Sequence, residues 1–162
     1  MSRLGFTPFT TAAASSRKLG ITTTHEEVHE YTVGTFAFWG LGVGSLGLDR
    51  PPEARAAFAE MFDLFLASDH TDRLCLALAA SGIALTADEA DLAEAARLRG
   101  AVATLRQSVA SSVSPQDDEL ERRFEQSLID GLGQETYVTE QAKGAGASLE
   151  ATIQLARSLV HS

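Results

Sequence analysis

The feature that most constrains this chain is a stretch without any charged residue, from Tyr31 to Leu48, in which aromatic and aliphatic residues are interspersed with glycine. A run of this kind is buried in the fold, docked on a partner or inserted in a membrane, because large exposed apolar patches are rare on monomeric proteins. Each glycine weakens a helix by about 1 kcal/mol relative to alanine. The glycines of the stretch are Gly34, Gly40, Gly42, Gly44 and Gly47.

One functional alternative for this stretch is a membrane-associated protein, which ranks below an interaction protein and a metal-dependent hydrolase. Its length reaches the lower limit for a membrane-spanning helix, about 17 residues, and Gly40 and Gly44 have the spacing that lets two helix backbones approach closely. The flanks lack the cluster of Lys or Arg that is typical of a span. We therefore expect burial or a protein partner. The candidate contact residues are Phe36, Phe38, Trp39, Leu41, Val43 and Leu46.

Length and composition predict one globular domain. The chain has 162 residues, of which 44% are hydrophobic and 22% charged, values in the range of single domains. Residues 1–23 are rich in Thr, Ser and Ala and lack an apolar period, so we expect an irregular arm there and a single helical domain at 24–162. The net charge of −9 argues against nucleic acid as a partner.

The N-terminal sequence and the cysteine content favour a cytoplasmic protein. The first twenty residues lack the apolar core of about 7–15 residues that a secretory signal needs. Cys75 is the single cysteine and lies in an apolar run, which predicts a buried, inert thiol.

Apolar residues recur at helical spacing after the Pro51-Pro52 pair. They follow the i, i+3, i+4 pattern from Ala54 to Phe65, which predicts an amphipathic helix that ends near Ser68. A second, nearly all-apolar helix is expected to follow and to end at Gly82, since glycine is the usual residue at a helix C-terminus.

Thr86 and Glu89 have the spacing of a capping box and predict the longest helix of the chain, over residues 87–113. This helix is a second candidate surface for a partner. Its apolar residues follow a three-four spacing and are Ala95, Leu98, Val102, Leu105 and Val109.

The C-terminal third contains two further helix starts. Pro115 and the acidic residues after it predict a helix that Gly131 or Gly133 ends, and Ser148 is expected to cap a last helix. The stretch around Tyr137 favours no particular element. No long alternating run of β-branched residues is present. The expected fold class is therefore all-α, a bundle of about five or six helices.

The sharpest chemical motif is His25-Glu26-Glu27-Val28-His29. On a helix that starts near His25, both imidazoles lie on one face and can bind one zinc ion, while Glu26 activates a bound water as general base. In this respect the segment resembles the zinc metallopeptidase signature, which implies a metal-dependent hydrolase. A third ligand would come from a distant residue such as His70.

The same acidic residues also have a purely structural explanation, because Glu27 completes a capping box with Thr24 and negative charges stabilise a helix N-terminus. We therefore expect no cofactor, with zinc as the alternative.

The function that the sequence favours is a non-catalytic interaction or scaffold protein. We expect a subunit that self-associates through residues 31–48 and whose partner is itself or another protein. The metal-dependent hydrolase is the alternative.

Overall fold

The computed structural model describes residues 25–68, 73–109 and 115–161, with side chains from residue 34 in the first range and from residue 118 in the last. These residues form seven α-helices and one short 3-10 helix, with no strand among them. The all-α class is therefore confirmed, while the expected count of five or six helices is too low. The arm expected at 1–23 lies outside the described residues.

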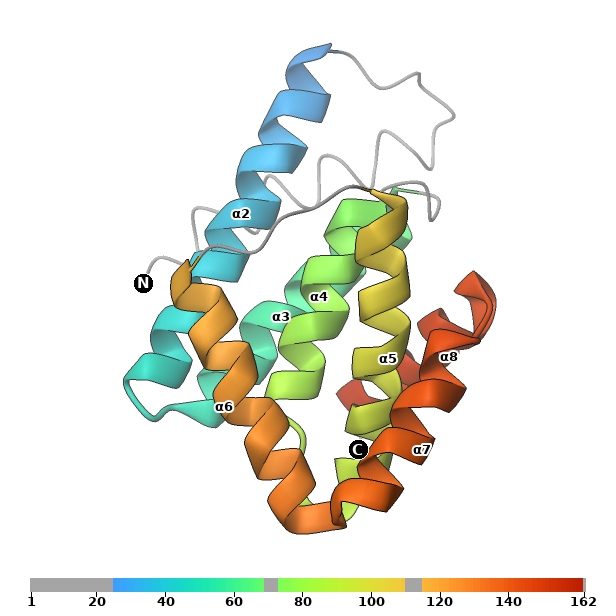
Figure 1. Cartoon of the computed structure of the whole chain (residues 1–162). Helices are drawn as coiled ribbons and strands as arrows, with labels where there is room; N and C mark the ends of the chain where they lie inside the picture. The colour runs from blue at the N-terminus through green and yellow to red at the C-terminus, as the bar shows by residue number, and fades with distance from the viewer. Residues whose placement is uncertain (1–24, 69–72, 110–114, 162) are drawn as a thin grey trace.

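The helices are shown in chain order in Figure 1. They are α2 (His25–Gly47), α3 (Pro51–Ala67), α4 (Arg73–Leu85), η1 (Glu89–Asp91), α5 (Leu92–Ser108), α6 (Pro115–Leu132), α7 (Gln134–Ala145) and α8 (Leu149–Val160). Helix α4 packs against α3 and α5 and also touches α2 and α8. Helices α5 and α7 pack closely together, although α6 lies between them in the sequence.

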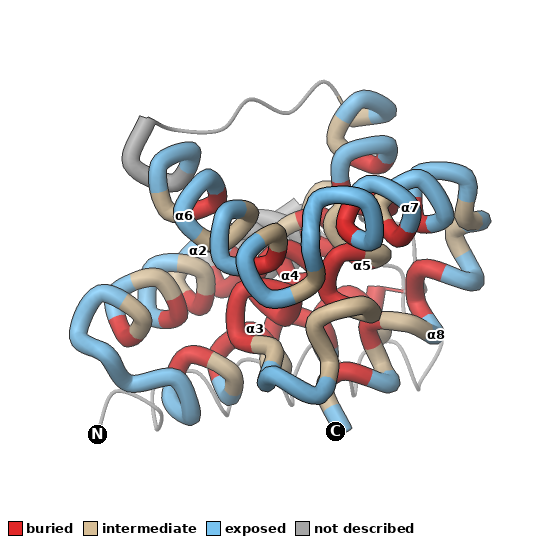
Figure 2. Tube along the Cα trace, turned by 60° about the horizontal axis from the view of Figure 1, so that its bottom comes forward, coloured by how far each residue is buried: buried red, intermediate tan, exposed pale blue. Residues whose placement is uncertain are grey.

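The hydrophobic core is centred on α4, which is buried along nearly its whole length, as Figure 2 shows. The Cys75 thiol lies within this core, as predicted, and contacts two neighbouring helices. Its Sγ atom lies 3.4 Å from the Met61 carbonyl oxygen, to which it donates, and 3.7 Å from the Thr35 hydroxyl, from which it accepts.

Helix α2 continues without interruption through the glycine-rich stretch. At 23 residues it is the longest described helix, so the expectation that residues 87–113 form the longest one is wrong. A Cβ atom on Gly42 or on Gly82 would overlap the Phe58 ring. That ring thus lies where α2, α3 and α4 meet, and the Trp39 ring lies 5.6 Å from it, centroid to centroid. Packing therefore outweighs the weak helix propensity of glycine here.

The end of α4 and the start of α5 differ from the prediction. Gly82 lies inside α4, which continues to Leu85. Thr86 does not cap the next helix; its hydroxyl donates back to the carbonyl oxygen of Ile83 at 3.0 Å. Because α5 begins only at Leu92, after the 3-10 turn, the predicted capping box is wrong.

The predicted starts of α6 and α8 are confirmed. Helix α6 begins at Pro115 and ends before Gly133, whose φ of +88° is a left-handed conformation that glycine adopts without strain. Ser148 precedes α8, and its hydroxyl oxygen accepts a hydrogen bond from the Ala151 amide at 3.1 Å. The local capping chemistry was sufficient to place these boundaries.

Helix α7 occupies the stretch around Tyr137 to which the sequence assigned no element. It packs on α5 through two glycines, since a Cβ atom on Gly100 would overlap the Gln141 carbonyl and one on Gly144 would overlap the Arg97 carbonyl. The two helix backbones are therefore in direct contact. An apolar stripe is not needed for such a contact, which is why the periodicity of the sequence did not reveal α7.

Candidate functional site

Residues 31–48 extend from the first third of α2 to the turn that follows this helix, and the structure divides the side chains of residues 34–48 into two faces. The inner face packs against α3 and α4. Its buried residues are Gly34, Thr35, Phe38, Gly42 and Ser45. Three large apolar side chains outside this inner face are exposed: Phe36 is 50% exposed, Leu41 41% and Leu48 68%.

The six contact residues predicted from sequence are thus distributed over both sides of the helix. Phe38 is in the core, with only 6% of its surface exposed. Trp39, Val43 and Leu46 are partly buried and pack against the core. Phe36 and Leu41 are the two that face outward.

Three glycines lie on the exposed side with Phe36, because residues at positions 36, 40, 44 and 47 share one side of a helix. A Cβ atom on Gly40, Gly44 or Gly47 would meet no other atom within 4 Å in the described part of the chain. These three glycines are therefore not required by packing inside that part of the fold, in contrast to Gly42. We call this surface the α2 outer face. It consists of Phe36, Gly40, Leu41, Gly44, Gly47 and Leu48.

The α2 outer face combines protruding side chains with a strip of bare backbone. Gly40 and Gly44 lie inside the helix, and each lowers helix stability by about 1 kcal/mol relative to alanine without a packing gain inside the described fold. The face carries no charge. A second helix can approach such a strip more closely than one covered by side chains.

The HEEVH segment begins α2, because the helix starts at His25 as predicted. The side chains of His25, Glu26 and His29 lie outside the described part of the structure, and so does His70. Among the side chains that are described, no three His, Cys, Asp or Glu residues gather as metal ligands would.

Within residues 25–68, 73–109 and 115–161, no helix has both the length and the apolar character that crossing a bilayer requires.

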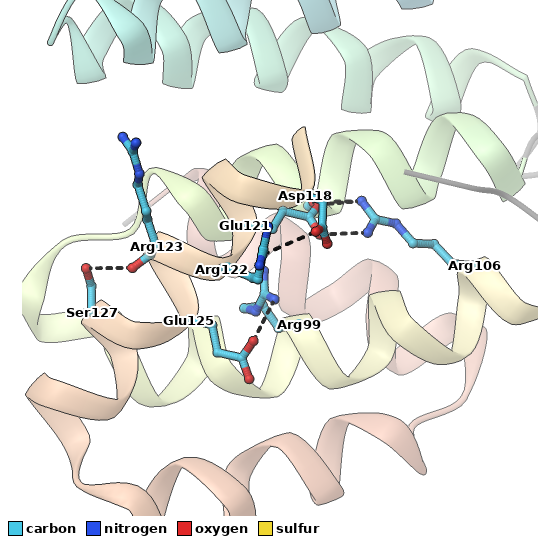
Figure 3. A network of polar contacts seen from close by, with 9 residues as sticks. Arg99, Arg106, Asp118, Glu121, Arg122, Arg123, Glu125 and Ser127 are labelled. Carbon is cyan, nitrogen blue, oxygen red and sulfur yellow. Dashed lines mark hydrogen bonds and ion pairs between the residues drawn. The ribbon is translucent and has the colours of Figure 1, made fainter. Parts of the chain in front are cut away.

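A second notable feature is a buried group of polar side chains between α4, α5 and α6. It consists of Ser81, Arg106 and Glu121, and we call it the Glu121 cluster. Figure 3 shows Arg106 and Glu121 pointing toward each other. The Arg106 guanidinium donates to both carboxylate oxygens of Glu121, at 2.8 and 2.5 Å. The Ser81 hydroxyl donates to the same carboxylate at 2.8 Å. Burial raises the pKa of Glu121, but the hydrogen bonds and charge of Arg106 outweigh it, so that this pKa lies below the ordinary value.

A looser polar group lies beside the Glu121 cluster and joins α5, α6 and α7. Arg99 of α5 lies 3.8 Å from the carboxylate of Glu125 on α6 and over the Phe124 ring. The Tyr137 hydroxyl of α7 is close to both charges, and burial raises its pKa. Among the described residues, the Arg99 Nε atom and the Tyr137 hydroxyl are the buried side-chain polar atoms without a hydrogen bond.

The sequence did not reveal these ion pairs, because their partners come from different helices. Arg97 of α5 donates to Glu140 of α7 at 2.6 Å. Lys143 also donates to Glu140, and these hydrogen bonds hold the pKa of Glu140 below its ordinary value. An ion pair between distant helices follows no fixed spacing in the sequence, so a single sequence does not reveal it.

Two ion pairs lie within α6 itself. Arg122 lies 3.2 Å from Asp118, and Arg123 lies 2.7 Å from Glu119, on the exposed side of the helix. Pairs of this kind contribute about 0.5 kcal/mol or less.

No protein-family model, no curated protein and no solved structure matches this chain. The α2 outer face and the Glu121 cluster are therefore the features from which a function can be inferred.

Proposed function

We propose that this chain is a non-catalytic helical interaction protein, a subunit that associates with a second copy of itself through the α2 outer face. The observation that supports this is the combination of exposed Phe36, Leu41 and Leu48 with a glycine strip that has no packing role inside the described fold. Removing apolar surface from water on association contributes about 25 cal/mol of favourable free energy per Å².

The charge distribution is compatible with a second copy as the partner of this face. The chain carries a net charge of −9, so two copies repel each other over much of their surface. The α2 outer face lies in the uncharged stretch 31–48, and two such faces meet without bringing like charges together. A two-fold interface of this kind uses the same patch on both copies.

The first prediction concerns the exposed side chains. We expect the wild-type protein to elute in gel filtration with light scattering at a mass above the 17.2 kDa of one chain. The double variant Phe36→Glu/Leu41→Glu should weaken association at least tenfold, since burying unpaired charge at the centre of an interface costs more than 1.4 kcal/mol. Both side chains are exposed, so the fold itself should be retained.

The matched control is Val138→Glu, because Val138 of α7 is 50% exposed, as is Phe36, but lies outside the α2 outer face. This variant should associate like the wild type. A wild-type protein that stays monomeric at high concentration would contradict the proposal, and so would an equal effect of Val138→Glu.

The second prediction concerns the glycine strip. The double variant Gly40→Ala/Gly44→Ala should raise the thermal stability of the monomer, since each replacement contributes about 1 kcal/mol of helix propensity and meets open space. The same variant should weaken association, because the added methyl groups hold the partner helix away. Thermal unfolding and light scattering on one sample measure both effects.

Gly42→Ala is the matched control on the same helix. A Cβ atom there overlaps the Phe58 ring, and overpacking of a core costs about 1–3 kcal/mol, so this variant should be less stable than the wild type. If Gly40→Ala/Gly44→Ala associates as strongly as the wild type, the partner does not approach the glycine strip.

A further inference from the structure

The charge of the chain is divided unevenly between residues 1–24, which we call the N-terminal segment, and the remainder. The segment contains Arg3, Arg17 and Lys18 and no acidic residue, so its side chains carry a charge of +3. Residues 25–162 carry −12, and the two parts together give the −9 of the whole chain. Opposite charges of this size attract the segment to the rest of its own chain.

The helix that directly follows the segment has the opposite charge. Helix α2 contains Glu26, Glu27 and Glu30 in its first two turns and has no Lys or Arg along its length. Its side chains therefore carry −3 at neutral pH with both histidines uncharged, which equals the charge of the segment with the sign reversed. Because the segment joins α2 at its acidic end, the two sets of charges are close in the sequence as well.

The N-terminal segment also carries apolar and small residues that suit the α2 outer face. Phe6 and Phe9 are aromatic, and burial of such side chains makes a large contribution to the stability of a contact. Residues 10–16 are all Thr, Ala or Ser. Side chains of this size can lie close to the bare backbone at Gly40 and Gly44, where a Cβ atom meets open space in the described part of the chain.

The length of the segment is sufficient for this contact. Helix α2 has 23 residues and is therefore about 35 Å long, whereas residues 10–24 span up to about 50 Å when extended. Phe9 can thus reach every part of the α2 outer face. Since the segment enters α2 at His25, it would run along this helix in the opposite direction, with Arg17 and Lys18 beside the acidic turns.

We propose that the N-terminal segment folds back along α2 of the same chain and covers the α2 outer face. Its basic pair lies near the acidic start of α2, and Phe6 and Phe9 contact the exposed apolar side chains of the face. The segment thereby limits self-association, a consequence that rests on the function proposed above, because the segment and a second copy compete for one surface. A tethered segment has an effective concentration on the order of millimolar, which gives it the advantage over a second copy in dilute solution.

Photo-crosslinking of the full chain tests the contact directly. With the photoreactive amino acid p-benzoylphenylalanine in place of Phe9, irradiation should attach the segment to residues 34–48, as identified by mass spectrometry of the digested protein. In a dilute mixture of isotope-labelled and unlabelled protein, both crosslinked peptides should carry the same label, because the contact lies within one chain. The matched control adds Phe36→Glu/Leu41→Glu, which should reduce the yield of this crosslink at least tenfold.

Light scattering measures the competition. Phe6→Ser/Phe9→Ser in the full chain should strengthen self-association at least tenfold, because the apparent affinity for a second copy is reduced by the fraction of chains whose face is covered. Both substitutions lie outside the described helices, so the helical fold should be retained. Thr10→Ser/Thr11→Ser is the matched control in the same segment and should associate like the wild type.

The two measurements distinguish this inference from the proposed function. A protein that stays monomeric but forms the crosslink to residues 34–48 within one chain supports the docking of the segment and contradicts self-association. A protein that associates, but whose crosslinks reach other helices or join labelled to unlabelled chains, overturns the inference and leaves self-association in place. An associating protein in which Phe6→Ser/Phe9→Ser has no effect would show that the segment does not compete with a second copy.

Discussion

Gly144→Ala is expected to separate α7 from α5 and to destabilise the protein by about 3 kcal/mol or more, at the upper end of overpacking effects. The added methyl group would overlap the Arg97 carbonyl and crowd the main chain at Ala101. Main-chain atoms within a helix cannot rotate away as a side chain can. The helix α7 must therefore move as a whole, which disturbs the ion pair between Arg97 and Glu140.

Urea unfolding followed by circular dichroism measures this effect, and Gly146→Ala is its matched control. A Cβ atom on Gly146, two residues later, would lie 3.9 Å from the nearest atoms, an ordinary contact. That variant should unfold within about 0.5 kcal/mol of the wild type, as do most substitutions away from close contacts. A similar stability for the two variants would show that α5 and α7 are not in backbone contact.

Phe58→Ala should have the second large effect, a loss of about 3–5 kcal/mol as is typical of a buried Phe→Ala change. The Phe58 side chain is fully buried and lies against Gly42 of α2, Gly82 of α4 and the Trp39 ring. Its removal leaves a cavity where three helices meet. The Trp39 fluorescence should shift to longer wavelength as water enters, which adds a local signal to the urea measurement.

A second substitution, Gly82→Ala, should lower stability when residue 58 is Phe and raise it when residue 58 is Ala. In the wild type the new methyl group overlaps the Phe58 ring and destabilises the fold. In Phe58→Ala it fills part of the cavity and restores stability, since the cost of a cavity increases with its volume. A double-mutant cycle with the four proteins gives the coupling directly. Additive effects of the two substitutions would contradict the packing described for the ring.

The fold class and several helix boundaries could be predicted because they depend on local chemistry. Pro51, Pro115 and Ser148 each act within one turn of their own position, and the structure places helix starts at all three sites. Gly82 misled the prediction of the end of α4, because it was judged by the local preference of glycine for helix ends. In this fold it makes room for the Phe58 ring of α3.

The candidate site could be predicted only as a segment. Charged residues normally mark the solvent side of a helix, and residues 31–48 contain none, so the apolar pattern gave no means to tell the outward Phe36 from the buried Phe38. The Glu121 cluster was missed because Ser81, Arg106 and Glu121 come from three helices. Which acidic residue faces which arginine is decided by the three-dimensional packing alone.

The contacts between helices also suggest an order of assembly during synthesis. Pairs that follow each other along the chain, α2 with α3, α3 with α4 and α4 with α5, pack directly, so each is complete soon after its second member leaves the ribosome. Short sequence separation of this kind favours rapid folding. Helix α7 instead returns to α5 across the whole of α6. Until then the backbone around Gly100 lacks the Gln141 carbonyl that it contacts in the complete fold, and the C-terminal third completes a domain whose N-terminal part is already formed.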